Sequence, residues 1–197
     1  MIDRALLFIR DQLNLYLSRQ GGGAGAGLEE PVVFVEGDKL DPLTLKTGAV
    51  SALLVNLEQD NVMRRDDPFV RTLPDGSPMR SSPAIRLNLW VLFVARFHAY
   101  EAGLAALSRV LQFFQANPLF EARSSPALDP GIGRLAVELH TLPTAEQNDL
   151  WGALRIAYHP SLLFKVKMVV IDDGAAAAAP AVTDSQLELA HAVQAAP

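Results

Sequence analysis

The alternation of apolar and polar positions predicts most of the regular elements of this chain. Apolar residues recur at helical spacing through Ile2–Leu17, which predicts an amphipathic first helix. A period of two residues predicts strands at Val50–Gln59, Ala84–Phe97 and Leu162–Ile171, and the run PVVFVE at Pro31–Glu36 is expected to be a short strand. The second half of Ala84–Phe97 is apolar on both faces, so we expect this strand at the centre of the sheet.

Two further helices and a hairpin complete the expected fold. Helical spacing returns from Tyr100 to Phe114, and Asn117-Pro118 is expected to end that helix. Thr144 and Gln147 have the spacing of a capping box, which predicts a helix start there. A weaker strand or hairpin is expected within 119–140, with its apolar side chains on one face, namely Leu135, Val137 and Leu139. The sequence therefore predicts an α+β fold, a mixed and mostly antiparallel sheet with about three helices packed on one face.

Three segments interrupt this pattern. Residues 60–83 form a long excursion, which we interpret as a projecting hairpin arm that turns at Pro74-Asp75-Gly76. The run GGGAGAG at 21–27 is expected to be a flexible loop. Residues 174–197 are rich in alanine and expected to be mostly disordered, with a possible short helix at 184–193. We thus expect one domain over 1–173 and a disordered tail.

Composition narrows the class of protein. The 197 residues are 50% apolar, with a net charge of −5 and without cysteine. Disulfides and thiolate chemistry are therefore excluded, and the acidic balance argues against nucleic-acid binding. No apolar run is long enough to span a membrane, and the acidic residues near the N-terminus argue against a signal peptide. These features favour the cytoplasm.

The sequence contains no motif that predicts a catalytic, metal-binding or cofactor-binding site. The four histidines, His98, His140, His159 and His191, have no partner at the spacing of a helical zinc site. The acidic pairs are sequence neighbours, which on a strand point to opposite faces and so rarely act together as acid and base. The glycine run follows a helix and lacks the Lys-Ser/Thr of a phosphate loop. We expect no enzyme activity and no cofactor.

The last third of the chain carries a family resemblance. The pattern L-P-T-x-E-x-x-x-L-W begins at Leu142, Y-x-P-S-L-x-F-x-V begins at Tyr158, and Ile171-Asp172 closes it. It resembles the tail-terminator, or cap, proteins of extracellular contractile injection systems, which are particles built like contractile phage tails. The resemblance spans roughly 2–173 and is specific in its last third.

This resemblance implies a structural cap at the baseplate-distal end of the tube and sheath. It implies a small α+β domain that forms a six-membered ring, with tail sheath and inner tube proteins as partners. Assembly is expected in the bacterial cytoplasm, and the released particle would carry the cap. The exposed edge near Leu162–Ile171 and the arm are expected to make the contacts, with these candidate interface residues: Arg64, Arg65, Phe69, Arg71, Met79, Arg80, Lys165 and Lys167.

An alternative function stays open at this point. A regulatory α+β module would bind a small molecule in a pocket formed by four aromatic residues, Trp90, Phe93, Tyr100 and Phe114. The same residues suit a closed core equally well.

Overall fold

The computed structural model of the chain describes residues 1–19, 31–36, 43–60, 70–72, 78–80, 85–171 and 177–178. Contacts divide the chain into two units. The first, here called the body, comprises Met1–Val62 and Ile85–Ile171. The second, here called the arm unit, comprises Met63–Ala84 and Asp172–Pro197.

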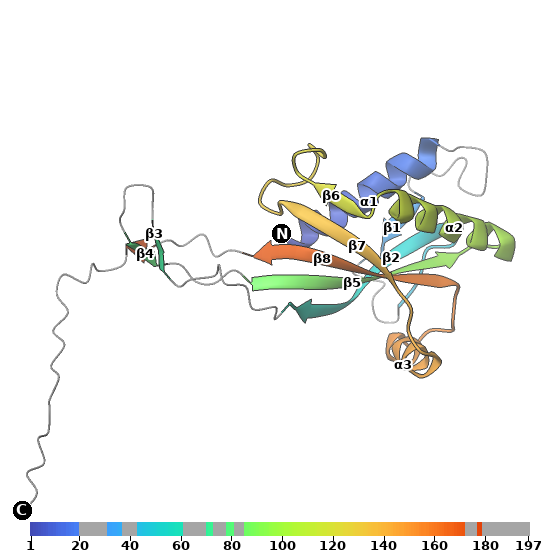
Figure 1. Cartoon of the computed structure of the whole chain (residues 1–197). Helices are drawn as coiled ribbons and strands as arrows, with labels where there is room; N and C mark the ends of the chain where they lie inside the picture. Colours follow the sequence, from blue (N-terminus) through green and yellow to red (C-terminus); the bar gives the residue numbers. More distant parts are fainter. Residues whose placement is uncertain are drawn as a thin grey trace, which may run out of the picture. The chain divides into compact units, whose positions relative to one another are not determined.

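A six-stranded sheet forms the frame of the body. Its strands are β1 (Val32–Phe34), β2 (Ala49–Gln59), β5 (Ile85–Arg96), β6 (Leu119–Glu121), β7 (Arg134–His140) and β8 (Ser161–Ile171). They lie in the order β1-β2-β5-β8-β7-β6, and each neighbouring pair is antiparallel except β1 with β2, which is parallel. The predicted central position of the 84–97 strand is confirmed by β5 (Figure 1).

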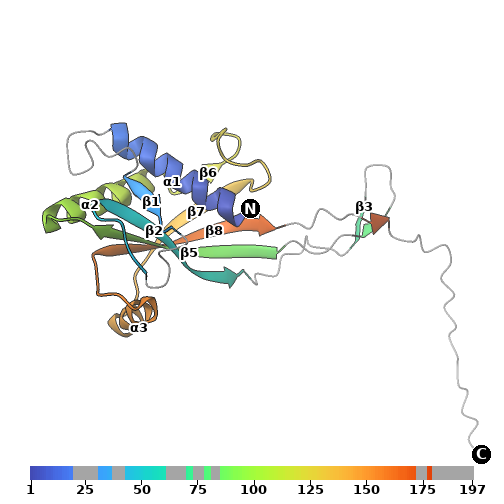
Figure 2. The same cartoon turned by 180° about the vertical axis from the view of Figure 1, so that it is seen from behind.

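Two helices, α1 (Ile2–Arg19) and α2 (Tyr100–Ala116), cover one face of this sheet (Figures 1 and 2). Their buried side chains share a core with alternate residues of β5, including Leu89, Val91 and Phe93. Helix α1 crosses from one edge of the curved sheet to the other. Its Phe8 ring lies 5.3 Å from that of Phe120 in β6, and its Asn14 side chain bonds to Val32 in β1.

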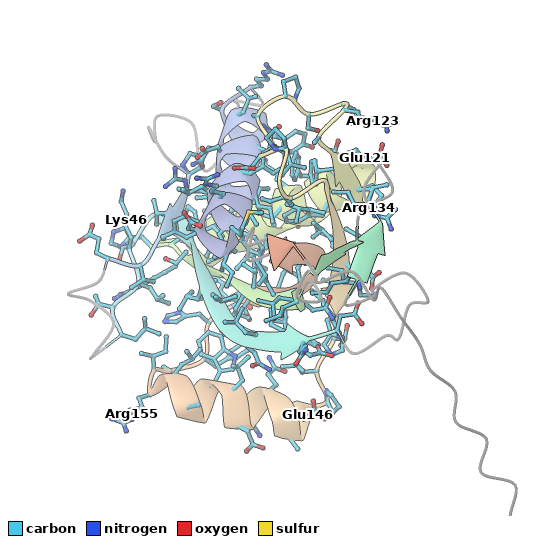
Figure 3. The ribbon with its side chains drawn as sticks, turned by 90° about the vertical axis from the view of Figure 1, so that its left-hand side faces the viewer. Lys46, Glu121, Arg123, Arg134, Glu146 and Arg155 are labelled. Carbon is cyan, nitrogen blue, oxygen red and sulfur yellow. The ribbon has the colours of Figure 1, made fainter. Side chains whose placement is uncertain are left out.

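The third helix, α3 (Thr144–Leu154), lies on the opposite face, as Figures 1 and 3 show. Its Trp151 is buried with Leu92 and Val94 of β5 and with Leu163 of β8, in a core separate from that of α1 and α2. Because successive residues of a strand point to opposite faces, the second apolar face of β5 needs its own cover. The predicted α+β fold class and mixed sheet are confirmed. The expectation that all three helices share one face is corrected for α3.

The predicted capping box is wrong. Thr144 is the first residue of α3, and Pro143 precedes it in the N-cap position without a side-chain cap bond. A capping box requires the hydroxyl at the N-cap, one residue earlier than Thr144 lies. The backbone N–H of Gln147 instead donates to the backbone carbonyl of Pro143 at 2.9 Å. The helix ends at Arg155, which adopts the left-handed conformation with φ of 56°.

Other boundaries agree closely with the sequence pattern. Asn117 is the C-cap that follows the last residue of α2, as predicted, and 119–140 contains the antiparallel pair β6 and β7. Leu135 and Val137 are buried on one face of β7, whereas Leu139 further along the same face is 50% exposed. None of the helices within the described residues is long and apolar enough to cross a membrane.

The described part of the arm unit is a small three-stranded sheet. It contains β3 (Val70–Thr72), β4 (Pro78–Arg80) and β9 (Ala177–Ala178), with β4 in the middle. The antiparallel pairing of β3 and β4 agrees with the predicted hairpin. The predicted turn at 74–76, the glycine run at 21–27 and the possible helix at 184–193 lie outside the described residues. The division into one domain and a disordered tail stays a prediction.

Candidate assembly surfaces

Lys165 and Lys167 lie in the middle of the sheet. Strand β8 pairs with β5 on one side, and its stretch 163–167 pairs with β7 on the other, so the expectation of an exposed edge is wrong for these five residues. For 168–171 it stays a prediction. The period-two pattern identified the strand but carries no information on its neighbours. The two outermost strands are β1 and β6.

Lys165 holds three strands together on the α3 face. Its ammonium lies 2.7 Å from the Glu58 Oε2 atom and 5.0 Å from the centre of the Trp90 ring. The Trp90 indole N–H donates to the same Glu58 oxygen at 2.9 Å. The Lys165 side chain is only 19% exposed. It is thus already neutralised inside the body, which weakens its candidacy as an interface cation.

The contacts among Lys165, Glu58 and Trp90 form a cross-strand network, which extends to β7 on the same face of the sheet. The Lys167 ammonium lies 2.6 Å from Glu138 Oε2, and the His140 ring meets Trp90 edge-on at 4.5 Å. Lys165 donates to Glu58, and this bond, followed by the one from Trp90, holds the pKa of the Glu58 carboxyl below its usual range. Side chains of β2, β5, β7 and β8 are therefore linked to one another on the α3 face of the sheet.

The remaining predicted interface residues belong to the arm unit. Arg64, Arg65 and Phe69 lie outside the described residues. Arg71 belongs to β3, and Met79 and Arg80 belong to β4, where β4 pairs antiparallel with β3. The arm residues and the two lysines thus fall in different units, and their interface role stays a prediction.

Sequence reasoning missed an apolar groove of about 650 Å³ at the β1–β2 edge of the body. We call it the edge groove. It is lined by Leu6, Phe34, Val35, Leu43, Ala52, Leu53, Leu54, Val55, Ala153, Leu154 and Arg155. Arg155 is the single charged residue of this lining and lies at one end of α3, with Glu146 at the other end (Figure 3).

The edge groove exists because β1 is short. Strand β1 pairs only with Val50–Ala52, whereas β2 continues to Gln59, so from Leu53 onwards β2 has no outer neighbour among the described strands. Leu54 and Leu57 on this stretch are 38% and 47% exposed. The apolar alternation of β2 was visible in the sequence, but its missing neighbour depends on the strand order.

Side-chain amides partly protect this edge against the addition of another strand. The Asn14 amide donates to the Val32 carbonyl at 3.0 Å and accepts from the Val32 N–H at 2.7 Å. On β2, the side-chain Oδ1 atom of Asn56 accepts from the Leu57 backbone N–H at 2.8 Å, next to a register shift between Leu54 and Asn56. Bulges and occupied edge groups are known protections against unwanted strand pairing.

The four aromatic residues of the alternative function do not surround one pocket. Phe93 and Phe114 are buried together in the core under α1 and α2, with ring centres 5.6 Å apart. Trp90 points to the other face of the sheet, and Tyr100 is 67% exposed. The prediction that these four residues form one small-molecule pocket is therefore wrong.

Among the described residues, no group of three or more His, Asp or Glu side chains is placed to hold a metal ion. His98 is exposed before α2, and His140 contacts Trp90. Burial, aided by the nearby charge of Arg96, lowers the pKa of His159. His191 lies outside the described residues.

Comparisons with known proteins agree with the family resemblance found in the sequence. Residues 6–184 match the family model of the Pvc16 N-terminal domain. A chain in a cryo-EM structure, described as the PVC sheath/tube terminator of an extracellular contractile injection system in the extended state, has the same fold, with a TM-score of 0.58 and 15% identity. The match covers 98% of this chain and 65% of that chain. No curated protein matches the sequence.

Proposed function

Because this chain belongs to the family of the Pvc16 N-terminal domain, we propose that it is the tail terminator of a contractile injection particle. In this role it caps the baseplate-distal end of the inner tube and sheath. The family match over 6–184 carries the proposal. The solved structure with the same fold is described as a sheath/tube terminator, and that description supports the assignment.

The proposed means of capping is a closed ring of six copies. A stack of six-fold rings keeps growing while its last ring exposes unsatisfied contacts. Heterologous contacts between neighbouring copies close into a ring when the rotation between them is 60° (six-fold symmetry). Such a ring matches the last sheath and tube ring on one face and presents a surface that does not propagate on the other.

Sheath and tube proteins are the proposed partners, and the role is structural, without catalysis. The support is the family match, together with the description of the solved structure as a sheath/tube terminator. We place assembly in the bacterial cytoplasm, after which the cap remains part of the released particle.

Localisation on the particle tests this function. An affinity tag after Pro197 would be expressed in cells that make the particle, and purified particles would be gold-labelled and imaged by electron microscopy. The expected result is label at one end only, opposite the baseplate. A tagged sheath subunit is the control, because its label must run along the whole shaft. Particles without label, with the tagged chain free in the lysate, contradict the proposal.

A further inference from the structure

A pocket of about 350 Å³ lies at the end of the body sheet where β5 leads into α2. At this end of β5, Arg96 lies opposite Ala49, the first residue of β2. Val94 lies opposite Ser161, the first residue of β8, so three segments of the chain meet there. The pocket, here called the basic pocket, is lined by Thr47, Ala95, Arg96, Phe97, His98, Ala99, Tyr100, Gly103, His159 and Pro160.

The described lining of the basic pocket contains three basic side chains, Arg96, His98 and His159, and no aspartate or glutamate. Glu101, the nearest acidic residue along the chain, is exposed on α2 and does not belong to this lining. One guanidinium N–H of Arg96 donates to the Leu45 carbonyl at 2.8 Å, and no carboxylate among the described residues forms an ion pair with Arg96. A guanidinium carries five N–H donors, and this bond uses one of them.

Other partly buried basic residues of the body are neutralised by their surroundings. The side chains of Lys165, Lys167 and Arg10 each have a nitrogen atom within 2.7 Å of a carboxylate oxygen. In the basic pocket the charge of Arg96 acts on His159 instead, because burial first, and then this charge, lower the pKa of the imidazole. Like charges in a partly buried site repel each other, and a bound negative group relieves that repulsion.

Apolar surface lies behind these donors. Ala95 and Gly103 of the lining are buried, and Phe97 is half-buried. Hydrogen bonds to an anion are stronger next to such surface, because the local dielectric constant is lower than in water. The planar guanidinium also matches the spacing of two oxygen atoms in a carboxylate or phosphate group.

We propose that the basic pocket binds an oxyanion, a carboxylate or phosphate group, between Arg96 and the two histidines. The basic pocket and the edge groove share no lining residue. The inference goes beyond the proposed terminator function and does not depend on it.

Binding is tested on the purified full-length chain by NMR, through the C–H signals of the imidazole rings. Inorganic phosphate and acetate are titrated separately at fixed pH, and sodium chloride of equal ionic strength is the control. The signals of His98 and His159 are expected to shift to saturation with at least one of the two oxyanions, but not with chloride. His140, which contacts Trp90 on the α3 face, is the internal reference and should not shift.

Variants test whether this lining holds the anion, with the His159 signal as the readout. Arg96→Gln is expected to raise the half-saturating concentration about tenfold, the change that loss of one hydrogen bond to a charged group produces. His98→Gln, at an exposed position, is expected to raise it about threefold, within the range of exposed ion pairs. Arg134→Gln, on an exposed arginine of β7, is the matched control and should leave binding unchanged (Figure 3).

Each variant must keep the circular dichroism spectrum and melting temperature of the parent. If Arg96→Gln fails to fold, because Arg96 also bonds to Leu45, His98→Gln decides.

Particles show whether the oxyanion is free in solution or belongs to a partner protein. Arg96→Gln and Arg134→Gln replace the parent in cells that make the particle, and the amount of chain in purified particles is compared. A loss of incorporation confined to Arg96→Gln identifies an acidic group of a partner protein. Equal incorporation identifies a free anion.

The proposal is overturned if neither oxyanion shifts the signals to saturation, or if His140 shifts equally. It is also overturned if Arg96→Gln and His98→Gln bind as the parent does, or if Arg134→Gln loses binding as they do. None of these results bears on the terminator function, which the position of the tagged chain on the particle decides.

Discussion

The two edges of the body sheet are finished in different ways. At the β6 edge, the 122–133 loop folds back on the start of α1, where Arg4 forms an ion pair with Asp129 and Gly131 lies against Met1. Leu128 and Ile132 of this loop are buried, at 1% and 3% exposure. At the β1 edge, none of the described residues fills the edge groove, and Leu54 of its lining and the nearby Leu57 are exposed.

This difference separates stability from assembly. Apolar surface that a chain covers with its own residues contributes to its folding, whereas apolar surface left open is available to a partner. Substitutions at the β6 edge should therefore act mainly on the stability of the monomer. Substitutions in the edge groove should act mainly on its incorporation into particles.

The largest effect is expected for Phe120→Ala at the closed edge. Phe120 is 6% exposed, and its ring contacts those of Phe8 and Phe113. Loss of a buried phenylalanine side chain costs about 3–5 kcal/mol, because it combines lost burial with a new cavity. Urea unfolding followed by circular dichroism measures the change. The neighbouring Leu119→Ala, at a position 47% exposed, is the control and should change the free energy of unfolding little; equal losses would contradict the comparison.

A smaller loss is expected for Asn14→Ala at the open edge. The Asn14 amide pairs with both the N–H and the carbonyl of Val32, a residue that is 0% exposed. Two backbone groups left without partners should cost about 1–3 kcal/mol. Ser18→Ala removes a hydroxyl that bonds to the Leu15 carbonyl within the same helix, and serves as the control in the same unfolding assay. A neutral Asn14→Ala would show that this amide does not secure β1.

Glu58→Gln is expected to destabilise the body by about 0.2–1 kcal/mol, the range of exposed ion pairs. Glu58 accepts from both Lys165 and Trp90, whereas Glu138 pairs with Lys167. Glu138→Gln should therefore have a smaller effect than Glu58→Gln in thermal unfolding experiments. The reverse order would argue against Trp90 as the centre of the cross-strand network.

The smallest expected effect concerns how the free energy of unfolding falls at acidic pH. The backbone N–H of Gly131, and then Arg4, lower the pKa of Asp129, while Lys165 and then Trp90 lower that of Glu58. A carboxyl whose pKa is lower in the folded state contributes stability above its unfolded pKa, and this contribution is lost as the pH falls through the folded pKa. Stability should thus decline from roughly pH 4 downwards, the unfolded carboxyl range.

Asp129→Asn should flatten this decline. Asp129 contacts Gly131 and Arg4 at the closed edge, and its replacement removes the carboxylate that these groups stabilise. The free energy of unfolding is measured as a function of pH for the variant and the parent. Asp149→Asn, at an exposed position on α3, is the control. Parallel curves for Asp129→Asn and the parent would contradict the contribution of Asp129.

The longer strands of the body could be predicted because each shows its own local pattern, in which apolar and polar residues alternate with a period of two. Strands β2 and β5 begin and end within about a residue of the predicted bounds. Helix α2 was recognisable from its spacing and from Asn117. These features depend on local periodicity, which a sequence displays directly.

Features that depend on which elements are neighbours could not be predicted. Strand β8 was assigned to an edge because its pattern gave no sign of β7 beside it. Helix α3 was placed with the others, although the second apolar face of β5, with Leu92 and Val94, indicated a need for cover there. The edge groove follows from the shortness of β1, and no alternation of residues encodes that.

The end of the particle is where the account is tested most directly. Deleting the gene in a strain that makes the particle, and restoring it on a plasmid, would be followed by electron microscopy of particle lengths and distal ends. The account predicts open or overgrown tubes and sheaths without the chain, and normal particles when it is restored. Particles of normal length with intact distal ends in the deletion strain would contradict it.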